Sequence, residues 1–440
     1  MHLQILPFSA LCGALVLIVG CGGVSSSNPD VSGSSPKVVT FTVSGITPSV
    51  VATRVGSGPF IAATLTSGTV TISLPTGVNN FAVAYTCSTL LPPNGLTGSG
   101  VAEQDVYEAT TLDGSSFTGS CLGGVAPPPA APATGMLSGS VDARAIPGVS
   151  SLAIEGMGSG YASSFNFPST NASSFSLAAA TGANRVLALA YNDVSSPPAS
   201  SGSTTLAAAK SFDNQAAPGT VNGGNPIVLA PSDETTSVPI TYSSLPAGFA
   251  LPDTTANLVT SFGGTGRIIA APATAHYPAL PAGAIESGDY YSIYTVASNG
   301  AEVTAITTTS TSAVPINFTF PAKWSYAGPI PASMPVFDLT YTGFSGTSGI
   351  NYLASWNWWP ANFGGQYLTF VHATGNYLNG AKSITWPDIS GVTGFLPPPA
   401  SGTYIDWTAA VTQTTYTSQP ASTANSTVTS VANNGSYKVP

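Results

Sequence analysis

Apolar residues alternate with threonine and serine along much of this chain. In the segments 39–44 (Val-Thr-Phe-Thr-Val-Ser) and 69–74 (Thr-Val-Thr-Ile-Ser-Leu), every second residue is apolar. A period of two is typical of β-strands that bury one face and leave the other in contact with water. The run 81–87 continues the pattern and places Cys87 on the apolar face of a third strand. These strands predict a β-sandwich over residues 37–124.

The same pattern returns after a proline-rich spacer. Thr-Gly-x-Asn, followed by an apolar run that ends in tyrosine, begins at Thr76 and again at Thr181, 105 residues further on (181 minus 76). A spacing of about 100 residues is the length of one sandwich domain, and it predicts two copies of one fold. Val-Pro-Ile-Thr-Tyr at 238–242 and Val-Pro-Ile-Asn-Phe at 314–318 open alike and predict a third and a fourth unit. The one helix that the pattern favours is short, Thr204–Ser211.

Two of these units resemble known sandwich families. Gly135–Val141, Phe175–Leu177 and the strand Val186–Leu189 resemble the transthyretin-like sandwich called carboxypeptidase-regulatory-like, although Asn171–Ser173 stands where that family typically has Asp-Gly. Tyr404–Trp407 resembles the closing strand of bacterial fibronectin type III-like sandwiches. Both resemblances imply a fold and transfer no catalytic site.

The expected fold is all-β, a tandem of antiparallel β-sandwich modules of immunoglobulin-like or transthyretin-like type behind a signal peptide and a flexible tether. Its expected parts are a lipoprotein signal peptide (1–20), a tether (21–36), a first sandwich (37–124), a Pro/Ala linker (125–134), a second sandwich (135–232), a third sandwich (233–312), a Trp-rich fibronectin III-like sandwich (313–417) and a Ser/Thr/Asn-rich tail (418–440).

Composition narrows the possible partners. Only 6% of the 440 residues are charged, against about 25% in average globular chains. Nine basic and 18 acidic residues give a net charge of -9 and no basic patch, so binding to a nucleic acid lacks its main driving force. The hydrophobic content of 43% is enough to build cores, and the surface must then consist mainly of Ser, Thr, Asn and Gly.

The N-terminal pattern predicts an export signal. Leu11–Val19 is a short apolar run, too short for the roughly 20 residues of a bilayer-spanning helix. Leu17–Cys21 (Leu-Ile-Val-Gly-Cys) resembles the lipobox of bacterial lipoprotein precursors, which implies that Cys21 is acylated and that membrane lipid is a partner. Met1–Ser9 departs from that family because it has no Lys or Arg. An ordinary cleaved signal, with Cys21 merely in the tail, is the alternative.

The residues after the expected anchor bear on localisation. Gly22–Pro36 is rich in Gly, Ser, Pro and Asn, has no Lys or Arg, and suits a flexible tether. The lipoprotein family's inner-membrane retention signal, an Asp directly after the cysteine, is absent because Gly22 stands there. The expected localisation is the cell envelope, at the outer membrane if the cell has one.

Two cysteines remain for the folded part. Cys12 leaves with the signal and Cys21 is assigned to lipid, so Cys87 and Cys121 are one even pair in an oxidising compartment. A disulfide between them closes a loop of 34 residues (121 minus 87), worth on the order of 3 to 4 kcal/mol in the chain-entropy model. Two free structural thiols are the alternative.

The tryptophans give the clearest functional hint. All six lie in the expected fourth unit: Trp324, Trp356, Trp358, Trp359, Trp386 and Trp407. Aromatic side chains bind flat apolar ligand faces, although tryptophan is also a core residue of such sandwiches. Trp358 and Trp359 are consecutive, so in a strand they point to opposite faces. If Trp356 and Trp358 face inward, Trp359 faces outward just before Pro360. We take these three residues as the candidate ligand-binding set.

The acids Glu103, Asp105, Glu108 and Asp113 cluster between the two cysteines. Calcium favours oxygen-rich loops, but the spacing lacks the Asp-x-Asp-x-Asp-Gly run of an EF-hand. We therefore expect a solvated hairpin here.

Motifs for catalysis are few. After the signal, His276 and His372 are the available histidine bases, without a Gly-x-Ser-x-Gly elbow and without CxxC or HxxxH spacing for zinc. A glycosidase-type carboxylate pair stays open, because its separation is spatial. We assign no catalytic residue, no metal ligand and no cofactor.

These observations predict a lipid-anchored envelope protein of non-catalytic structural, adhesive or scaffold type, with envelope proteins or a surface glycan as partners. The alternatives are a carbohydrate-binding lipoprotein that uses the Trp-rich unit and, third, a polysaccharide-active enzyme with an unrecognised carboxylate site.

Overall fold

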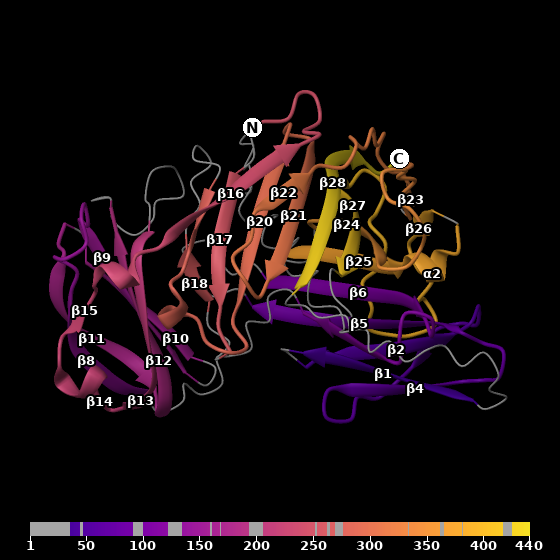
Figure 1. The fold of residues 1–440 in the computed structure, drawn as a ribbon. Coiled ribbons are helices and arrows are strands. Elements are labelled where there is room, and N and C mark those ends of the chain that lie inside the picture. The colour runs from indigo at the N-terminus through magenta and orange to yellow at the C-terminus, as the bar shows by residue number, and fades with distance from the viewer. Residues whose placement is uncertain are drawn as a thin grey trace.

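The computed structural model describes residues 36–44, 47–90, 100–121, 134–158, 161–167, 169–192, 206–250, 253–261, 265–268, 276–332, 334–360, 365–380, 382–416 and 425–440. Strands dominate these residues, and α2 (Gly375–Leu378) is the one α-helix among them (Figure 1). The predicted all-β fold is confirmed. The expected signal peptide, its Cys21, the tether and the Pro/Ala linker as far as residue 133 lie outside the described residues.

One 12-stranded sheet crosses the molecule (Figure 1). In sheet order its strands are β18 (Thr265–Ile268), β17 (Asp253–Val259), β20 (Tyr290–Ser298), β21 (Glu302–Ser310), β28 (Ser426–Lys438), β27 (Tyr404–Tyr416), β24 (Ile350–Trp358), β25 (Gln366–Thr374), β6 (Gly100–Thr110), β5 (Asn80–Leu90), β2 (Val50–Val55) and β3 (Ile61–Ala62). Neighbours are antiparallel except β25 and β6, which are parallel. Backbone hydrogen bonding therefore continues through strands of the first, third and fourth expected units.

The expectation of a frayed tail after Thr417 is wrong. β28 lies between β21 and β27 in the middle of the long sheet. Val431 and Ala432 on this strand are buried on opposite faces. The Ser/Thr/Asn-rich composition does not show the alternating apolar pattern by which strands are recognised. On one face of β28 the small residue Ala432 packs against Ala305 and Ala410 of the flanking strands.

The expected helix Thr204–Ser211 is also wrong, because strand β13 (Leu206–Ala217) occupies this part of the chain. Its alanines are good helix formers, but tertiary packing overrides that preference. Ala208 packs in the core of the second sandwich, while the next residue, Ala209, packs in the core of the neighbouring unit. Burial on alternate sides is the period of a strand.

A three-stranded sheet covers one face of β5 and β6. It consists of β4 (Thr69–Leu74), β1 (Lys37–Ser44) and β7 (Ser116–Ser120) in that order, with β1 and β7 parallel. Phe41, Ile72, Phe81, Val83 and Tyr85 are buried between the layers. The other face of β5 and β6 packs into a different core, to which Ala82, Ala84 and Val106 contribute, so both strands are covered on two faces.

The predicted disulfide between Cys87 and Cys121 is confirmed. Their Cα atoms are 6.0 Å apart, and both residues are buried in this first core. The bond links β5 to the residue that follows β7, so it joins the two layers of the sandwich. The loop of 34 residues that it closes corresponds to about 3 to 4 kcal/mol of stabilisation in the chain-entropy model.

A second sandwich lies at the other end of the molecule (Figure 1, magenta). One layer is β10 (Tyr161–Phe167), β9 (Ser151–Gly158), β12 (Gly182–Tyr191) and β13; the other is β11 (Ala172–Ala180), β8 (Thr134–Asp142) and β14 (Gly219–Thr220), with β15 (Ile227–Val228) also paired to β8. Leu137, Ile154, Phe175 and Val186 are among the residues buried between these layers.

A smaller sheet covers the long sheet near this sandwich. Its order is β19 (His276–Ala279), β16 (Thr236–Ser243) and β22 (Ile316–Thr319), and it packs on β17 and β20. β22 comes from the segment that was expected to open the fourth unit, yet it pairs in parallel with β16, which belongs to the third.

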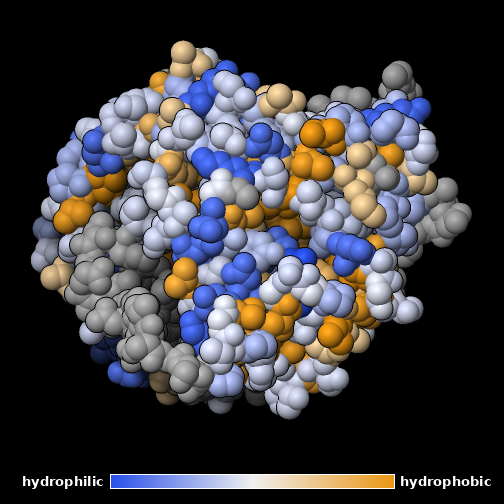
Figure 2. Space-filling model, turned by 90° about the vertical axis from the view of Figure 1, so that its right-hand side faces the viewer, coloured by the Kyte–Doolittle hydropathy of each residue, from blue (hydrophilic) through white to orange (hydrophobic). Residues whose placement is uncertain are grey.

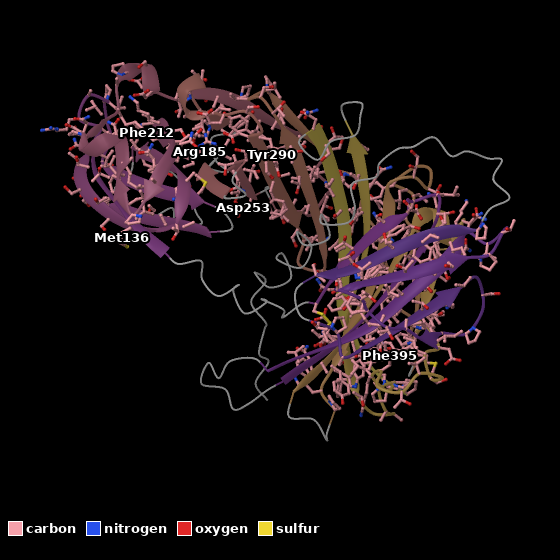
Figure 3. The ribbon with its side chains drawn as sticks, turned by 90° about the horizontal axis from the view of Figure 1, so that it is seen from below. Met136, Arg185, Phe212, Asp253, Tyr290 and Phe395 are labelled. Atoms are coloured by element: carbon pink, nitrogen blue, oxygen red, sulfur yellow. A yellow bond between two sulfur atoms is a disulfide. The ribbon has the colours of Figure 1, made fainter. Side chains whose placement is uncertain are left out.

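A buried ion pair joins the second sandwich to this region. Arg185 Nη1 on β12 donates to both carboxylate oxygens of Asp289, at 2.8 and 2.6 Å, and neither side chain is exposed. Arg185 Nη2 donates to the carbonyl of Ala284 at 2.9 Å, and Nε donates to the hydroxyl of Ser211. Figure 3 labels Arg185 and Tyr290 at the junction between the sandwich and the long sheet.

Candidate functional site

The tryptophans divide into core and surface. Four tryptophans are buried in a core between the long sheet and the chain that covers it: Trp324, Trp356, Trp358 and Trp386. The covering chain includes the two-stranded sheet of β23 (Val336–Asp338) and β26 (Ser383–Thr385). Trp407 is partly buried against the same core.

Trp358 and Trp359 point to opposite faces, as the alternation predicted. Trp358, the last residue of β24, is 2% exposed, whereas Trp359 is 54% exposed. The assignment of Trp356 and Trp358 to a ligand-binding set is wrong, because both rings lie in the core. Trp359 alone of the three reaches the surface.

Strand register brings a second aromatic residue to the end of the sheet at which Trp359 lies. β24 and β27 pair antiparallel, and their last directly opposed residues at this end are Asn357 and Asp406. Tyr404 lies two positions further along β27, on the same face as Asp406, and Trp359 directly follows the end of β24. Tyr404 is 68% exposed. Sequence reasoning missed its exposure, because Tyr404 was considered only as part of a fibronectin-like closing strand.

A lysine completes this row. Tyr404 pairs with Lys438 on β28, and Lys438 Nζ lies 5.6 Å from the centroid of the Tyr404 ring. A cation over an aromatic face at this distance is attracted by the ring quadrupole. We call Trp359, Tyr404 and Lys438 the aromatic row. Tyr404 and Lys438 project from the paired strands β27 and β28, and Trp359 directly follows the end of the next strand, β24.

The acids of β6 are not a solvated hairpin, so that expectation is wrong. Glu103 and Asp105 are 2% and 3% exposed, in a strand that is covered on both faces. Their partners on β5 are Cys87 and Tyr85, which places both acids beside the disulfide core. The clustering of acids between the two cysteines suggested a solvated hairpin, but the three-stranded sheet and β25 cover this strand.

A histidine from β25 lies next to these acids. His372 Nε2 is 3.6 Å from Asp105 Oδ1, and the imidazole stacks on Tyr107 with 4.2 Å between centroids and 7° between planes. Burial raises the pKa of Asp105 to about 7 and lowers the pKa of His372 to about 4. The histidine is therefore neutral at pH 7.

Two further acids, Glu108 on β6 and Asp113 just after this strand, connect the first sandwich to α2. Glu108 pairs with Arg54, and Tyr377 donates to Glu108 at 3.3 Å. Burial raises the pKa of Glu108, and the Arg54 guanidinium opposes that rise. Asp113 accepts hydrogen bonds from Thr374 at 2.6 Å and from Asn376 at 2.7 Å. Both acids thus hold neighbouring elements together.

The surface carries few charges. In the face shown in Figure 2, hydrophobic side chains (orange) come to the surface in separate patches among polar ones. Within the described ranges, no group of three or more His, Cys, Asp or Glu side chains is arranged to hold a metal ion. No helix in the described part of the chain has the length and apolar character that a bilayer crossing requires.

Comparisons with known proteins assign the chain to no family. No family model matches it, and no curated protein matches it. Among solved structures, it is similar to the tip fimbrial protein Mfa3 from Porphyromonas gingivalis with a C-terminal truncation, at 12% identity over 45% of this chain and 84% of that one. The TM-score of 0.16 is too low for the likeness to bear on function.

Proposed function

We propose that this chain is a non-catalytic, lipid-anchored protein of the cell envelope that acts by contact, as an adhesive or scaffold protein. The aromatic row is its contact surface, and a glycan is the ligand that this surface suits best. The anchor is an acyl chain on Cys21, in the outer membrane if the cell has one.

The exposure of Trp359 and Tyr404 carries this proposal. Two large rings, at 54% and 68% exposure, lie at the same end of the paired strands β24 and β27. Exposed rings bind flat apolar faces such as those of sugars, and aromatic residues dominate binding energies at contact surfaces. A disulfide between Cys87 and Cys121 supports an extracytoplasmic location, because such bonds persist in oxidising compartments.

The glycan contact is tested with the full ectodomain on a glycan array. Trp359→Ala and Tyr404→Ala should each lower the affinity for the bound glycan about tenfold or more, because truncating an aromatic hot spot costs about 1.4 kcal/mol or more. Ile61→Ala is the matched control, since Ile61 is 65% exposed on β3 at the edge of the sheet. Crosslinking on intact cells then separates a glycan from a protein ligand. Unchanged affinity of both aromatic variants for every captured partner contradicts the contact surface.

The anchor is tested by detergent phase partitioning. We expect the wild-type protein in the detergent phase and Cys21→Ser in the aqueous phase, because only the former carries an acyl chain. Cys12→Ser is the control and should partition as wild type does, since Cys12 lies inside the expected signal. Wild-type protein in the aqueous phase would falsify the anchor and leave the contact surface untouched.

A further inference from the structure

The expected tether enters the fold at a central strand. Lys37, the first residue of β1, directly follows the tether, and β1 lies between β4 and β7 in the three-stranded sheet. The strand pairs with β4 over six residues and with β7 over five. An edge strand can be pulled away by breaking one ladder of hydrogen bonds, whereas the withdrawal of β1 breaks two.

Side chains of β1 also hold the strand in place. Val39, Phe41 and Val43 are buried in the core of the first sandwich, so drawing the strand out exposes them to water. Lys37 Nζ donates to Asn79 Oδ1 at 3.0 Å and to Thr111 Oγ1 at 3.1 Å, which gives two contacts at the end of β1 where the tether begins. Tension on the tether therefore acts on a strand that is held at both edges and on its buried face.

The disulfide fixes β7, the parallel partner of β1. Cys121 directly follows β7, and its bond to Cys87 ties that strand to β5. β5 pairs with β6, which pairs in parallel with β25, and from there β24 and β27 lead through paired strands to Tyr404 of the aromatic row. Every step from Lys37 to Tyr404 is thus a strand ladder or the covalent bond. The second sandwich packs on β17 and β20, outside this route.

We infer that β1, β7 and the disulfide form a clamp that carries tension between the tether and the contact surface. The inference rests on the proposed function, because an anchor at one end and a bound partner at the other are the source of the tension. When the clamp yields, β1 to β4 are drawn out and the extension stops at Cys87, which is bonded to Cys121. This step releases the 50 residues 37–86 (87 minus 37), or about 17 nm at about 3.4 Å per residue.

The first test compares two points of load on the full ectodomain, with its disulfide intact, by single-molecule force spectroscopy. One handle is always on Pro440, two residues after Lys438. The other is either on Gly22 in the tether or, through Ile61→Cys, on the exposed edge strand β3. At equal loading rate the tether attachment should rupture at the higher force, with a first step of about 17 nm. Equal rupture forces overturn the inference, as does a first step of about 33 nm, the length of the 98 residues 135–232 (232 minus 134) of the second sandwich.

The second test removes the disulfide. In the double variant Cys87→Ser/Cys121→Ser, β7 is no longer bonded to β5, so the tether attachment should rupture at a lower force than in the wild type. The step should also lengthen by the 34 residues of the loop, or about 12 nm. An unchanged force and step length overturn the inference. If the double variant does not fold, the comparison of the two attachments decides alone. A failed anchor in the partitioning test leaves these forces unchanged, so the proposed function and the clamp fail separately.

Discussion

At the residue scale, Asp105 and His372 lie side by side, and burial shifts the pKa of each group in the direction that favours its neutral form. Asp105 is 3% exposed, and burial raises its pKa from 3.8 to about 7. His372 is partly buried, and burial lowers its pKa from 6.5 to about 4. Burial disfavours the charged form of each group, so both tend to be neutral around pH 5 to 6. An uncharged pair suits a position beside a disulfide core, where each isolated charge would be costly.

The two groups contribute to stability with opposite pH dependence. The folded state keeps a proton on Asp105 that the unfolded state releases, so the stability due to Asp105 is lost as the pH rises from about 4 to about 7. The unfolded state protonates His372 and the folded state does not, so the stability due to His372 is lost as the pH falls from about 6.5 to about 4. In the wild-type protein these contributions offset each other over most of this window.

Single substitutions separate the two contributions. Asp105→Asn should leave the histidine effect, so unfolding free energy rises with pH between about 4 and 6.5 relative to wild type. His372→Gln should leave the acid effect, so unfolding free energy falls with pH over the same range. Each slope differs from wild type by up to about 1.4 kcal/mol per pH unit. Urea unfolding at pH 4.5, 5.5 and 6.5 measures this. Parallel pH profiles for the three proteins would show that these groups titrate normally.

At the scale of elements, β28 connects the two parts of the 12-stranded sheet. It pairs with β21 on one side and β27 on the other, and Val431 and Val439 contribute to the tryptophan core. Without β28, two central strands have unpaired edges, which are templates for association with other chains. The C-terminal strand therefore joins β21 and the strands beyond it to β27 and the strands beyond that one.

A chain that stops at Tyr416 tests this role. We expect it to aggregate or to lose the near-ultraviolet circular dichroism of the buried tryptophans, because its core is open and its strand edges are exposed. A full-length chain with Lys438→Ala is the control and should keep the wild-type spectrum, since Lys438 is exposed at the end of the strand. A soluble truncated chain with an unchanged near-ultraviolet spectrum would contradict a structural role for β28.

Local pattern predicted the strands that alternate strongly, such as 39–44 and 69–74, and the opposite faces of Trp358 and Trp359. It could not predict elements whose side chains are small, because β28 and β13 are specified by the strands beside them. It also could not bring His372 next to Asp105, since that contact depends on the parallel pairing of β25 with β6, which are remote in sequence. Tyr404 joined the aromatic row for the same reason, through its register with β24 and β28.

At the scale of the whole molecule, the cores are shared between the expected units. The tryptophan core includes Ala52, Ala82 and Val106 from the first unit, together with β24, β25, β27 and β28. Another core joins Leu187 and Leu189 of the second sandwich to Leu258 and Ile293 of the third unit. A string of independent modules would have one closed core in each module. Here each unit instead completes the core of a neighbour, which predicts cooperative unfolding.

Calorimetry of the wild-type protein should therefore show one main transition, and Arg185 should be needed for it. Arg185→Ala leaves Asp289 buried without a counter-charge, which costs about 3 to 5 kcal/mol. Because this pair joins the second sandwich to the third unit, the sandwich should then unfold separately at a lower temperature. Arg144→Ala, at an exposed ion pair of the same sandwich, should leave stability nearly unchanged and keep the single transition. Several well-separated transitions in the wild-type protein would instead show units that fold independently, and the shared cores would then contribute little to their stability.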